Sequence, residues 1–328
     1  MKFIASLLFL LTSLLFAAGA WWLQHPLTLK SETVEITVEP GARARTVVQS
    51  LVDGGVQVQP QLLHWWIRLS GQSRHLKAGS YEINGQPTPR SLVAKLVRGD
   101  VAMRSVTLPE GQTFVQWREL LRTAPHLRPD TRDLSDSAIM EKLGRPGVPP
   151  EGRFFPDTYT YAKNSSDLTL LRHALQQMDQ RLAAAWAQRA PDSPLKTPDE
   201  ALILASIVEK ETGRPADRGL IAGVFNNRLR KGMMLQTDPT VIYGLGPKFD
   251  GNLRKRDLLA DTPWNTYTRA GLPPTPIAMP GQQALQAAVQ PEPTPALYFV
   301  ARGDGSSEFS ATLEEHNRAV RKYQLGQR

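Results

Sequence analysis

A glutamate on the apolar face of a short helix is the residue of this chain best suited to proton chemistry. Residues 197–213 are typical of one helix, because Thr197 is a suitable N-cap and Pro198 occupies the first helical position. At 100° per residue, Glu211 lies near the centre of the apolar stripe, whereas Glu209 points the opposite way. We therefore expect only Glu211 to face the interior.

Glu211 has two interpretations. In the first, its side chain reaches past the end of the apolar stripe to solvent or pairs with an arginine. In the second, it is a functional carboxyl held in a cleft, where burial and the negative end of the helix dipole raise its pKa. A glutamate that stays protonated near neutral pH is what a general acid requires.

Two polar segments downstream have the composition of loops that orient a polar ligand. The first, residues 234–246, is dense in hydrogen-bonding side chains around Pro239, and the second, residues 264–277, is polar, then aromatic, then rich in proline. The alternative is a well-ordered turn whose side chains cap their own backbone. The candidate substrate-binding residues are Gln236, Thr237, Asp238, Thr240, Tyr243, Asn265 and Tyr267.

The N-terminus contains one apolar run that is long enough to cross a bilayer. No charged residue occurs from Phe3 to Leu29, and residues 3–22 consist mainly of Leu, Phe, Ile and Ala. Lys2 precedes the run and Lys30 is the first cation after it, so the positive-inside rule predicts a cytoplasmic N-terminus and an exported remainder. The alternative is a cleaved signal peptide, because residues 18–20 match a small-x-small cleavage pattern. Both interpretations predict export.

Composition excludes several classes of function. The chain has no cysteine, which excludes disulfides, thiolate metal sites and cysteine nucleophiles. Its net charge of +8 is spread along the sequence rather than gathered in runs. In an exported protein, this charge indicates attraction to an anionic polymer or lipid surface rather than to nucleic acid.

We expect an α+β fold in three parts: an anchor over residues 1–29, a small α+β unit over 30–105 and a larger mixed α+β domain over 106–328. The small unit has the order strand, helix, helix, strand, with strands at 33–38 and 77–83 and helices at 45–54 and 61–69. This order is similar to a LysM-type glycan-binding module, although a structural spacer would show the same pattern. The further helices that we expect span 91–99, 135–143, 167–189, 217–231 and 313–323, and the further strands span 101–108, 297–300 and 308–310.

Several long motifs together resemble the YceG-like family, the endolytic murein transglycosylases. Their order and spacing also agree, and the resemblance runs from the anchor to the C-terminal helix. The motifs are Leu76-Lys77-Ala78-Gly79-Ser80-Tyr81, Ala205-Ser206-Ile207-Val208-Glu209-Lys210-Glu211-Thr212, Phe225-Asn226-Asn227-Arg228-Leu229, Leu235-Gln236-Thr237-Asp238-Pro239-Thr240-Val241-Ile242-Tyr243-Gly244, Asn265-Thr266-Tyr267 and Gly271-Leu272-Pro273-Pro274.

The resemblance implies cleavage of the β-1,4 bond between N-acetylmuramic acid and N-acetylglucosamine inside nascent strands, with a 1,6-anhydromuramoyl product end. It places the catalytic glutamate at Glu211, the residue that the helical face also selects. One carboxyl suffices because the muramic acid 6-hydroxyl attacks in place of water. No metal or cofactor is implied. The implied partners are peptidoglycan strands and the cytoplasmic membrane, with peptidoglycan synthases left open, and the implied location is the inner membrane with the catalytic domain outside the cytoplasm.

Two other functions remain in competition. A hydrolytic muramidase would need a second carboxylate, for which Asp238, Asp157 and Glu209 are the candidates. A membrane-tethered glycan-binding or assembly factor would use the same polar loops without catalysis, with a structural Glu211.

Overall fold

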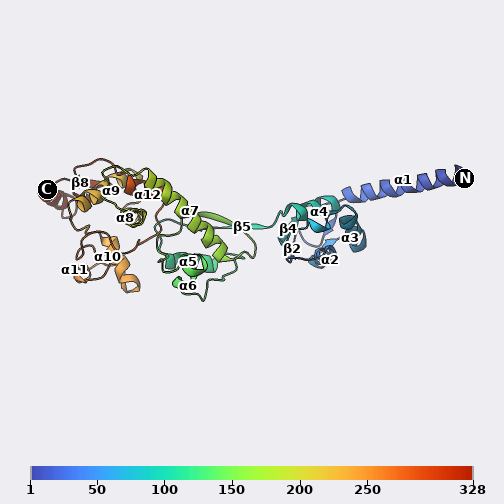
Figure 1. Cartoon of the computed structure of the whole chain (residues 1–328), viewed down its shortest axis with the longest axis horizontal. Coiled ribbons are helices and arrows are strands. Elements are labelled where there is room, and N and C mark those ends of the chain that lie inside the picture. Colours follow the sequence, from blue (N-terminus) through green and yellow to red (C-terminus); the bar gives the residue numbers. More distant parts are fainter. Residues whose placement is uncertain (1, 327–328) are drawn as a thin grey trace. The chain divides into compact units, whose positions relative to one another are not determined.

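The structure, a computed structural model, describes residues 2–326 in two compact units (Figure 1). The N-terminal unit runs to Ser105 and also takes in residues 125–128 and 160–165. The C-terminal unit comprises the remaining described residues. Helices and short two-stranded sheets occur in both units, so the predicted mixed α+β fold is confirmed.

The N-terminal unit begins with helix α1 (Lys2–Gln24). Its segment Ser6–Gln24 is apolar and long enough to cross a membrane, and none of its described side chains is fully buried inside the protein. At its C-terminal end, Trp22 packs against the core of the N-terminal unit, while Trp21 stacks on His25 with ring centroids 4.3 Å apart. The end of α1 is therefore attached to the unit that follows it.

The rest of the N-terminal unit has the expected order of strand, two helices and strand. Strand β2 (Thr33–Val38) pairs antiparallel with β4 (Gly79–Asn84), and α2 (Ala44–Gly54) and α3 (Pro60–Leu69) lie between them in sequence. Tyr81 is fully buried in the core, and its hydroxyl donates to the carbonyl of Lys77 over 2.7 Å. The remaining elements are β1 (Thr28–Leu29), β3 (Val56–Gln57), the 3₁₀ turn η1 (Gln72–Arg74), α4 (Pro89–Arg98) and β5 (Met103–Leu108).

Local sequence fixes where several helices begin. Thr88 before α4 and Thr113 before α5 (Phe114–Thr123) each accept a hydrogen bond from the third helical residue, and that residue's side chain accepts one from the cap's own backbone. Gly79 at the start of β4 has φ of 143°, and a Cβ there would lie 2.5 Å from Cγ1 of Val101. Only glycine fits this position without strain.

The C-terminal unit is mainly helical. Its strands are β6 (Asp157–Ala162), whose first half belongs here and which pairs with β5, and the hairpin of β7 (Tyr298–Ala301) and β8 (Ser307–Ser310). Its helices are α5, α6 (Asp136–Lys142), α7 (Asp167–Ala187), α8 (Pro198–Glu211), α9 (Pro215–Arg230), α10 (Asp238–Leu245), α11 (Lys255–Leu259), α12 (Gln282–Val289) and α13 (Leu313–Tyr323), with the 3₁₀ turn η2 (Gly246–Lys248).

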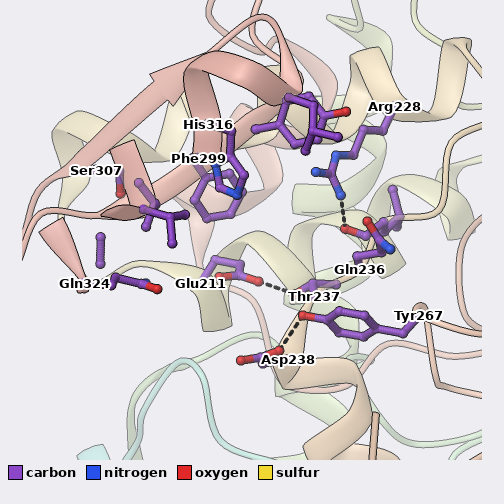
Figure 2. Close-up of a pocket in the computed structure, with 16 residues that line it drawn as sticks. Glu211, Arg228, Gln236, Thr237, Asp238, Tyr267, Phe299, Ser307, His316 and Gln324 are labelled. Atoms are coloured by element: carbon purple, nitrogen blue, oxygen red, sulfur yellow. Dashed lines mark hydrogen bonds between the residues drawn. The ribbon is translucent and has the colours of Figure 1, made fainter. Parts of the chain in front are cut away.

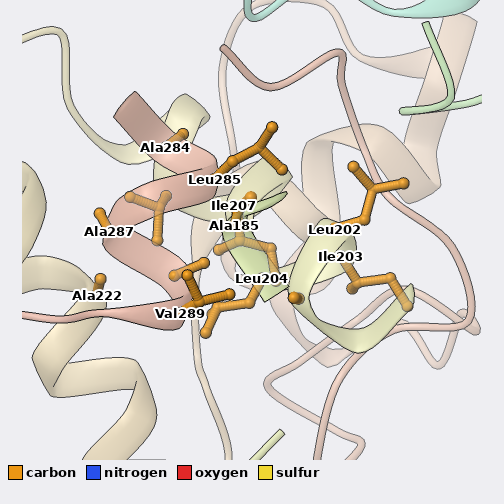
Figure 3. Packing of buried hydrophobic residues seen from close by; sticks show 14 of the residues in the cluster. Ala185, Leu202, Ile203, Leu204, Ile207, Ala222, Ala284, Leu285, Ala287 and Val289 are labelled. Carbon is orange, nitrogen blue, oxygen red and sulfur yellow. The ribbon is translucent and has the colours of Figure 1, made fainter. Parts of the chain in front are cut away.

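Helix α8 is the central element of this unit. Every residue from Ala201 to Val208 is buried, and α7, α9, α10 and α12 all contact the helix. Leu285 and Val289 of α12 belong to the same cluster of buried residues as Leu204 and Ile207 of α8, where the two helices pack together (Figure 3). The last residue of this tightly packed helix is Glu211, which is consequently held on a rigid support.

Several elements were not expected from the sequence, among them β6 and α11, and two further differences concern the neighbours of α8. Residues 238–245 form helix α10 rather than a loop, because Pro239 occupies the first turn of a helix, a position it favours. Helix α12 was not expected at all. Its sequence is short and rich in alanine and glutamine, which leaves little hydrophobic periodicity to detect.

Candidate active site

Glu211 lies at the C-terminal end of α8, in contact with the segment that precedes α10. The Thr197 hydroxyl caps the start of the helix by accepting a hydrogen bond from the Glu200 amide over 3.2 Å. At the other end, the Thr237 hydroxyl donates a hydrogen bond to Oε1 of Glu211 (Figure 2). This contact fixes the direction of the carboxyl group.

The environment of Glu211 favours its protonated form. Burial is the main cause that raises the pKa of this carboxyl from 4.5 to about 7, and the nearby carboxylate of Asp238 acts in the same direction. The hydrogen bond from Thr237 and the positive charge of Arg228 act in the opposite direction but do not cancel the effect of burial. Near pH 7, both the acid and the carboxylate form of Glu211 are populated.

The segment that carries Thr237 is held by Thr266 in the second polar loop. The Thr237 amide donates to the Thr266 hydroxyl over 3.1 Å, and the Gln236 amide donates to the Thr266 carbonyl over 3.1 Å. Gln236 has φ of 48°, a left-handed conformation that side chains other than glycine adopt at a cost. The loop around Thr266 compensates for this cost and brings the two polar segments together.

Arg228 of α9 supports the same segment from the other side. Its guanidinium donates to the carbonyl of Leu235 over 2.8 Å and to that of Leu297 over 2.6 Å. Arg228 is buried, and burial lowers its pKa from the usual value. In the sequence, Arg228 is named only as part of a family motif, and the structure places it in the wall of the site.

Glu211, Arg228 and Thr237 line a pocket of about 490 Å³. On the side nearest α10, Tyr267 donates a hydrogen bond to Oδ1 of Asp238 over 2.6 Å, and the two side chains lie close to Glu211 (Figure 2). The other wall comes from β7, β8 and α13 and includes Phe299 and His316. Burial lowers the pKa of His316, whose ring stacks on that of Tyr298 with centroids 5.2 Å apart. A polar wall and an aromatic wall thus enclose the carboxyl group.

The structure brings some of the predicted site residues together and separates others. Gln236, Thr237, Asp238 and Tyr267 line the pocket with Glu211. Thr240, Tyr243 and Asn265 are absent from the pocket wall.

Two of the separated residues, Thr240 and Asn265, lie behind the pocket wall and hold its backbone. Thr240 is fully buried and shares a hydrogen bond of 2.9 Å with the Thr266 hydroxyl. Asn265 is also fully buried, where its side-chain amide donates to the carbonyl of Ala260 over 2.6 Å and its oxygen accepts from the Tyr267 amide over 2.8 Å. Their positions favour a role in holding the two polar segments rather than in contacting a ligand.

Tyr243 leads to a second buried carboxyl that sequence reasoning missed. Its hydroxyl donates to Oε2 of Glu151 over 3.1 Å, and the Phe114 amide donates to Oε1 of the same carboxyl over 3.0 Å. Burial raises the pKa of Glu151 to about 7. Its position after Pro149 and Pro150 gave no periodic pattern that could have indicated burial.

The expectation that Glu209 faces away from the interior is wrong. Its side chain is only 5% exposed, with one carboxyl oxygen 3.6 Å from Nη2 of Arg218 and the other accepting from the Gly281 amide over 2.9 Å. Helical periodicity indicates one apolar face, but α8 is covered on several sides by neighbouring helices. Glu209 therefore belongs to a buried ion pair outside the pocket, and Asp157 is an exposed residue of β6.

The other carboxylate in the pocket wall is Asp238. Within residues 2–326, no three His, Asp or Glu side chains gather in an arrangement that could hold a metal ion. The arrangement is suited to proton transfer at one polar bond of a ligand that fits between the two walls.

A crystal structure of a yceG-like protein from Listeria monocytogenes has a similar fold. Its TM-score is 0.56 at 30% sequence identity, and the similarity covers 88% of this chain and 98% of that one. The motifs and the fold therefore point to the same class of protein.

The sequence is also similar to two curated relatives, each named endolytic murein transglycosylase. The relative from Bacillus subtilis strain 168 is 30% identical over 308 residues, which cover 89% of this chain and 85% of the relative. The relative from Streptococcus pneumoniae strain D39 is 26% identical over 88% of this chain and 58% of its own length. The model of the YceG-like family matches residues 36–322, so this chain belongs to the YceG-like family, as its motifs predicted.

Proposed function

We propose that this chain is an endolytic lytic transglycosylase of peptidoglycan. It cleaves the β-1,4 bond between N-acetylmuramic acid and N-acetylglucosamine within nascent glycan strands and leaves 1,6-anhydromuramoyl ends. Membership of the family and the names of its relatives support the reaction class. The observation that carries the assignment to a residue is the pKa of Glu211, raised to about 7 in a pocket wall.

The mechanism needs one carboxyl group in two protonation states. Protonated Glu211 donates its proton to the glycosidic oxygen as the bond from muramic acid C1 to that oxygen breaks. The resulting carboxylate then takes the proton of the muramic acid 6-hydroxyl, whose oxygen forms the new bond to C1. The acid is regenerated and no water is consumed. A pKa near the working pH suits both steps.

The neighbours of Glu211 have separate roles in this proposal. Thr237 orients the carboxyl through its hydrogen bond. Gln236, Asp238 and Tyr267 contribute polar groups that can hold the hydroxyl and amide groups of the sugars, and Phe299 offers an aromatic surface for a sugar face.

One observation favours a second candidate, a hydrolytic muramidase. Asp238 lies in the same pocket wall as Glu211 and could serve as the second carboxylate that hydrolysis requires. In the structure, its Oδ1 already accepts a hydrogen bond from Tyr267, which favours an electrostatic role over nucleophilic attack.

Digestion of isolated peptidoglycan in heavy-oxygen water tests both candidates. The purified full chain should release strands whose new ends are 1,6-anhydro forms without label, and mass spectrometry should locate the cuts within strands. Stoichiometric label in the new ends would show that water is the nucleophile and would favour Asp238 as a second catalytic group. No cleavage by a folded protein would favour a binding factor.

We also propose that α1 anchors the chain in the cytoplasmic membrane with its N-terminus inside and its remainder outside. The length and apolar character of Ser6–Gln24 support a span, and the positions of Lys2 and Lys30 in the sequence support the orientation. The chain should stay in the membrane fraction through high-salt and carbonate washes. A soluble form that begins at Trp21 would indicate a cleaved signal peptide instead.

The division into an anchor over 1–29, a LysM-like subdomain over 30–105 and a catalytic domain over 106–328 is part of this proposal. The pairing of β2 with β4 around α2 and α3 supports the LysM-like interpretation. Peptidoglycan synthases are candidate partners, because the proposed substrate is a nascent strand. Crosslinking in membranes would identify such a partner.

A further inference from the structure

Helix α3 of the N-terminal unit is apolar on two opposite faces. Leu63 and Ile67 are fully buried in the core. On the other face, Leu62, Trp65 and Leu69 are 46%, 53% and 80% exposed. Their spacing of three and four residues places them in one continuous stripe, and contiguous apolar stripes on a protein surface mark places where something else binds.

Positive charge borders this stripe. Between Asp53 and Glu82 the sequence contains no acidic residue, whereas Arg68, Arg74 and Lys77 fall within this interval. The Arg68 guanidinium lies over the ring of Trp65, 5.8 Å from its centroid. Arg68 and Arg74 also border a surface hollow of about 650 Å³. An apolar stripe beside exposed cations suits the boundary between acyl chains and anionic lipid headgroups.

The fold ties α3 to the end of the unit from which α1 leaves. Strand β1 begins four residues after α1 ends and pairs with β3, and α3 starts at Pro60, shortly after β3. Helix α1 also contacts α4, and Trp22 packs on the core of the unit. Figure 1 shows α3 at the side of the unit that α1 joins. If α1 spans the bilayer, α3 lies within reach of its outer surface.

We propose that Leu62, Trp65, Arg68, Leu69 and Arg74, called here the α3 patch, bind the outer leaflet of the cytoplasmic membrane. The three apolar side chains enter the interfacial layer, and the two guanidinium groups hold anionic lipid phosphates. The inference rests on the proposed anchoring by α1 and adds a second contact that fixes the orientation of the N-terminal unit. The anchor keeps the patch at a high local concentration of lipid, so lipid is its most accessible partner.

The absence of cysteine makes a direct test simple, because a single introduced cysteine can carry a polarity-sensitive fluorophore. The full chain is reconstituted in nanodiscs with one chain per disc, with either anionic or zwitterionic lipids. The label is placed at Leu69→Cys and, in a matched control, at Glu39→Cys. Glu39 is exposed and directly follows β2. It lies at the end of the β2–β4 sheet where Val38 pairs with Gly79 and where Val101 is close to Gly79.

We expect blue-shifted emission and quenching by nitroxide-labelled lipid at Leu69→Cys, and neither effect at Glu39→Cys. Adding Arg68→Glu and Arg74→Glu should weaken the quenching at Leu69→Cys in anionic discs. Each cation close to an anionic membrane increases the binding constant about five-fold. Each substitution should therefore lower the binding constant of the α3 patch at least about five-fold in anionic lipid, and much less in zwitterionic lipid.

Different failures have different meanings. If the label at Leu69→Cys reports water while the chain resists carbonate extraction, the α3 patch does not bind lipid and the α1 anchor stands. If carbonate extracts the chain, the anchor is wrong. A blue shift that requires added glycan would assign the patch to glycan binding, and one that requires two chains per disc would assign it to a second copy. Either result overturns the proposal.

Discussion

Replacing Glu211 with glutamine should make the stability of the C-terminal unit less dependent on pH. A pKa raised from 4.5 to about 7 means that the folded protein holds a proton that the unfolded chain has released. At about 1.4 kcal/mol per pKa unit, ionised Glu211 destabilises the fold by about 3 kcal/mol above pH 7. The penalty is absent well below pH 4.5, grows between pH 4.5 and about 7, and stays constant at higher pH. Glutamine is neutral throughout and avoids it.

The assay is thermal unfolding of the full chain at several pH values between about 4 and 8. Wild type and Glu211→Gln should agree at the acid end, and the variant should become progressively more stable toward neutral pH. Glu141→Gln, which removes an exposed carboxylate of α6, is the control and should show no such trend. A constant difference across the range would refute a raised pKa. Glu211→Gln should also lower the rate of peptidoglycan cleavage at least about 10²-fold, because an amide cannot donate the proton.

Other substitutions test the neighbours of Glu211. Thr237→Val removes the hydrogen bond that lowers the pKa of Glu211, so the alkaline limb of the pH profile of cleavage should move to higher pH. Arg228→Met removes the guanidinium that donates to three backbone carbonyls, those of Met234, Leu235 and Leu297, and should lower stability by about 1–3 kcal/mol in chemical denaturation. Tyr243→Phe removes a hydrogen bond that lowers the pKa of Glu151, so this pKa should rise further. The loss of thermal stability caused by the substitution should therefore be small at pH 5 and increase toward pH 8.

The sequence predicted the element that carries Glu211 better than it predicted the surroundings of that element. The cap at Thr197 and the apolar positions of α8 are local signals, and both bounds of the helix follow from them. The burial of Glu209 was missed because it depends on α9 and on the approach to α12, which lie far away in sequence. Periodicity cannot reveal a second layer of packing.

The same limit applies to the predicted ligand contacts. Thr240 and Asn265 are residue types that often bind ligands, but the residue type does not indicate whether a polar side chain faces a ligand or the protein's own backbone. The burial of Arg228 depends on the carbonyls of two separate segments, which no local pattern in the sequence brings together. Family motifs included all three residues, but a motif does not show whether a residue contacts the ligand or holds in place the residues that do.

Thr237 and Asp238 adjoin each other in sequence, yet they shift the pKa of Glu211 in opposite directions. If the whole segment moves away from α8, the hydrogen bond, the neighbouring charge and the burial are lost together, and because burial has the largest effect, the pKa of Glu211 falls. A rotation that separates only one of them changes the proton affinity. A bound sugar that moves or turns this segment would therefore adjust the acidity of Glu211 during the reaction.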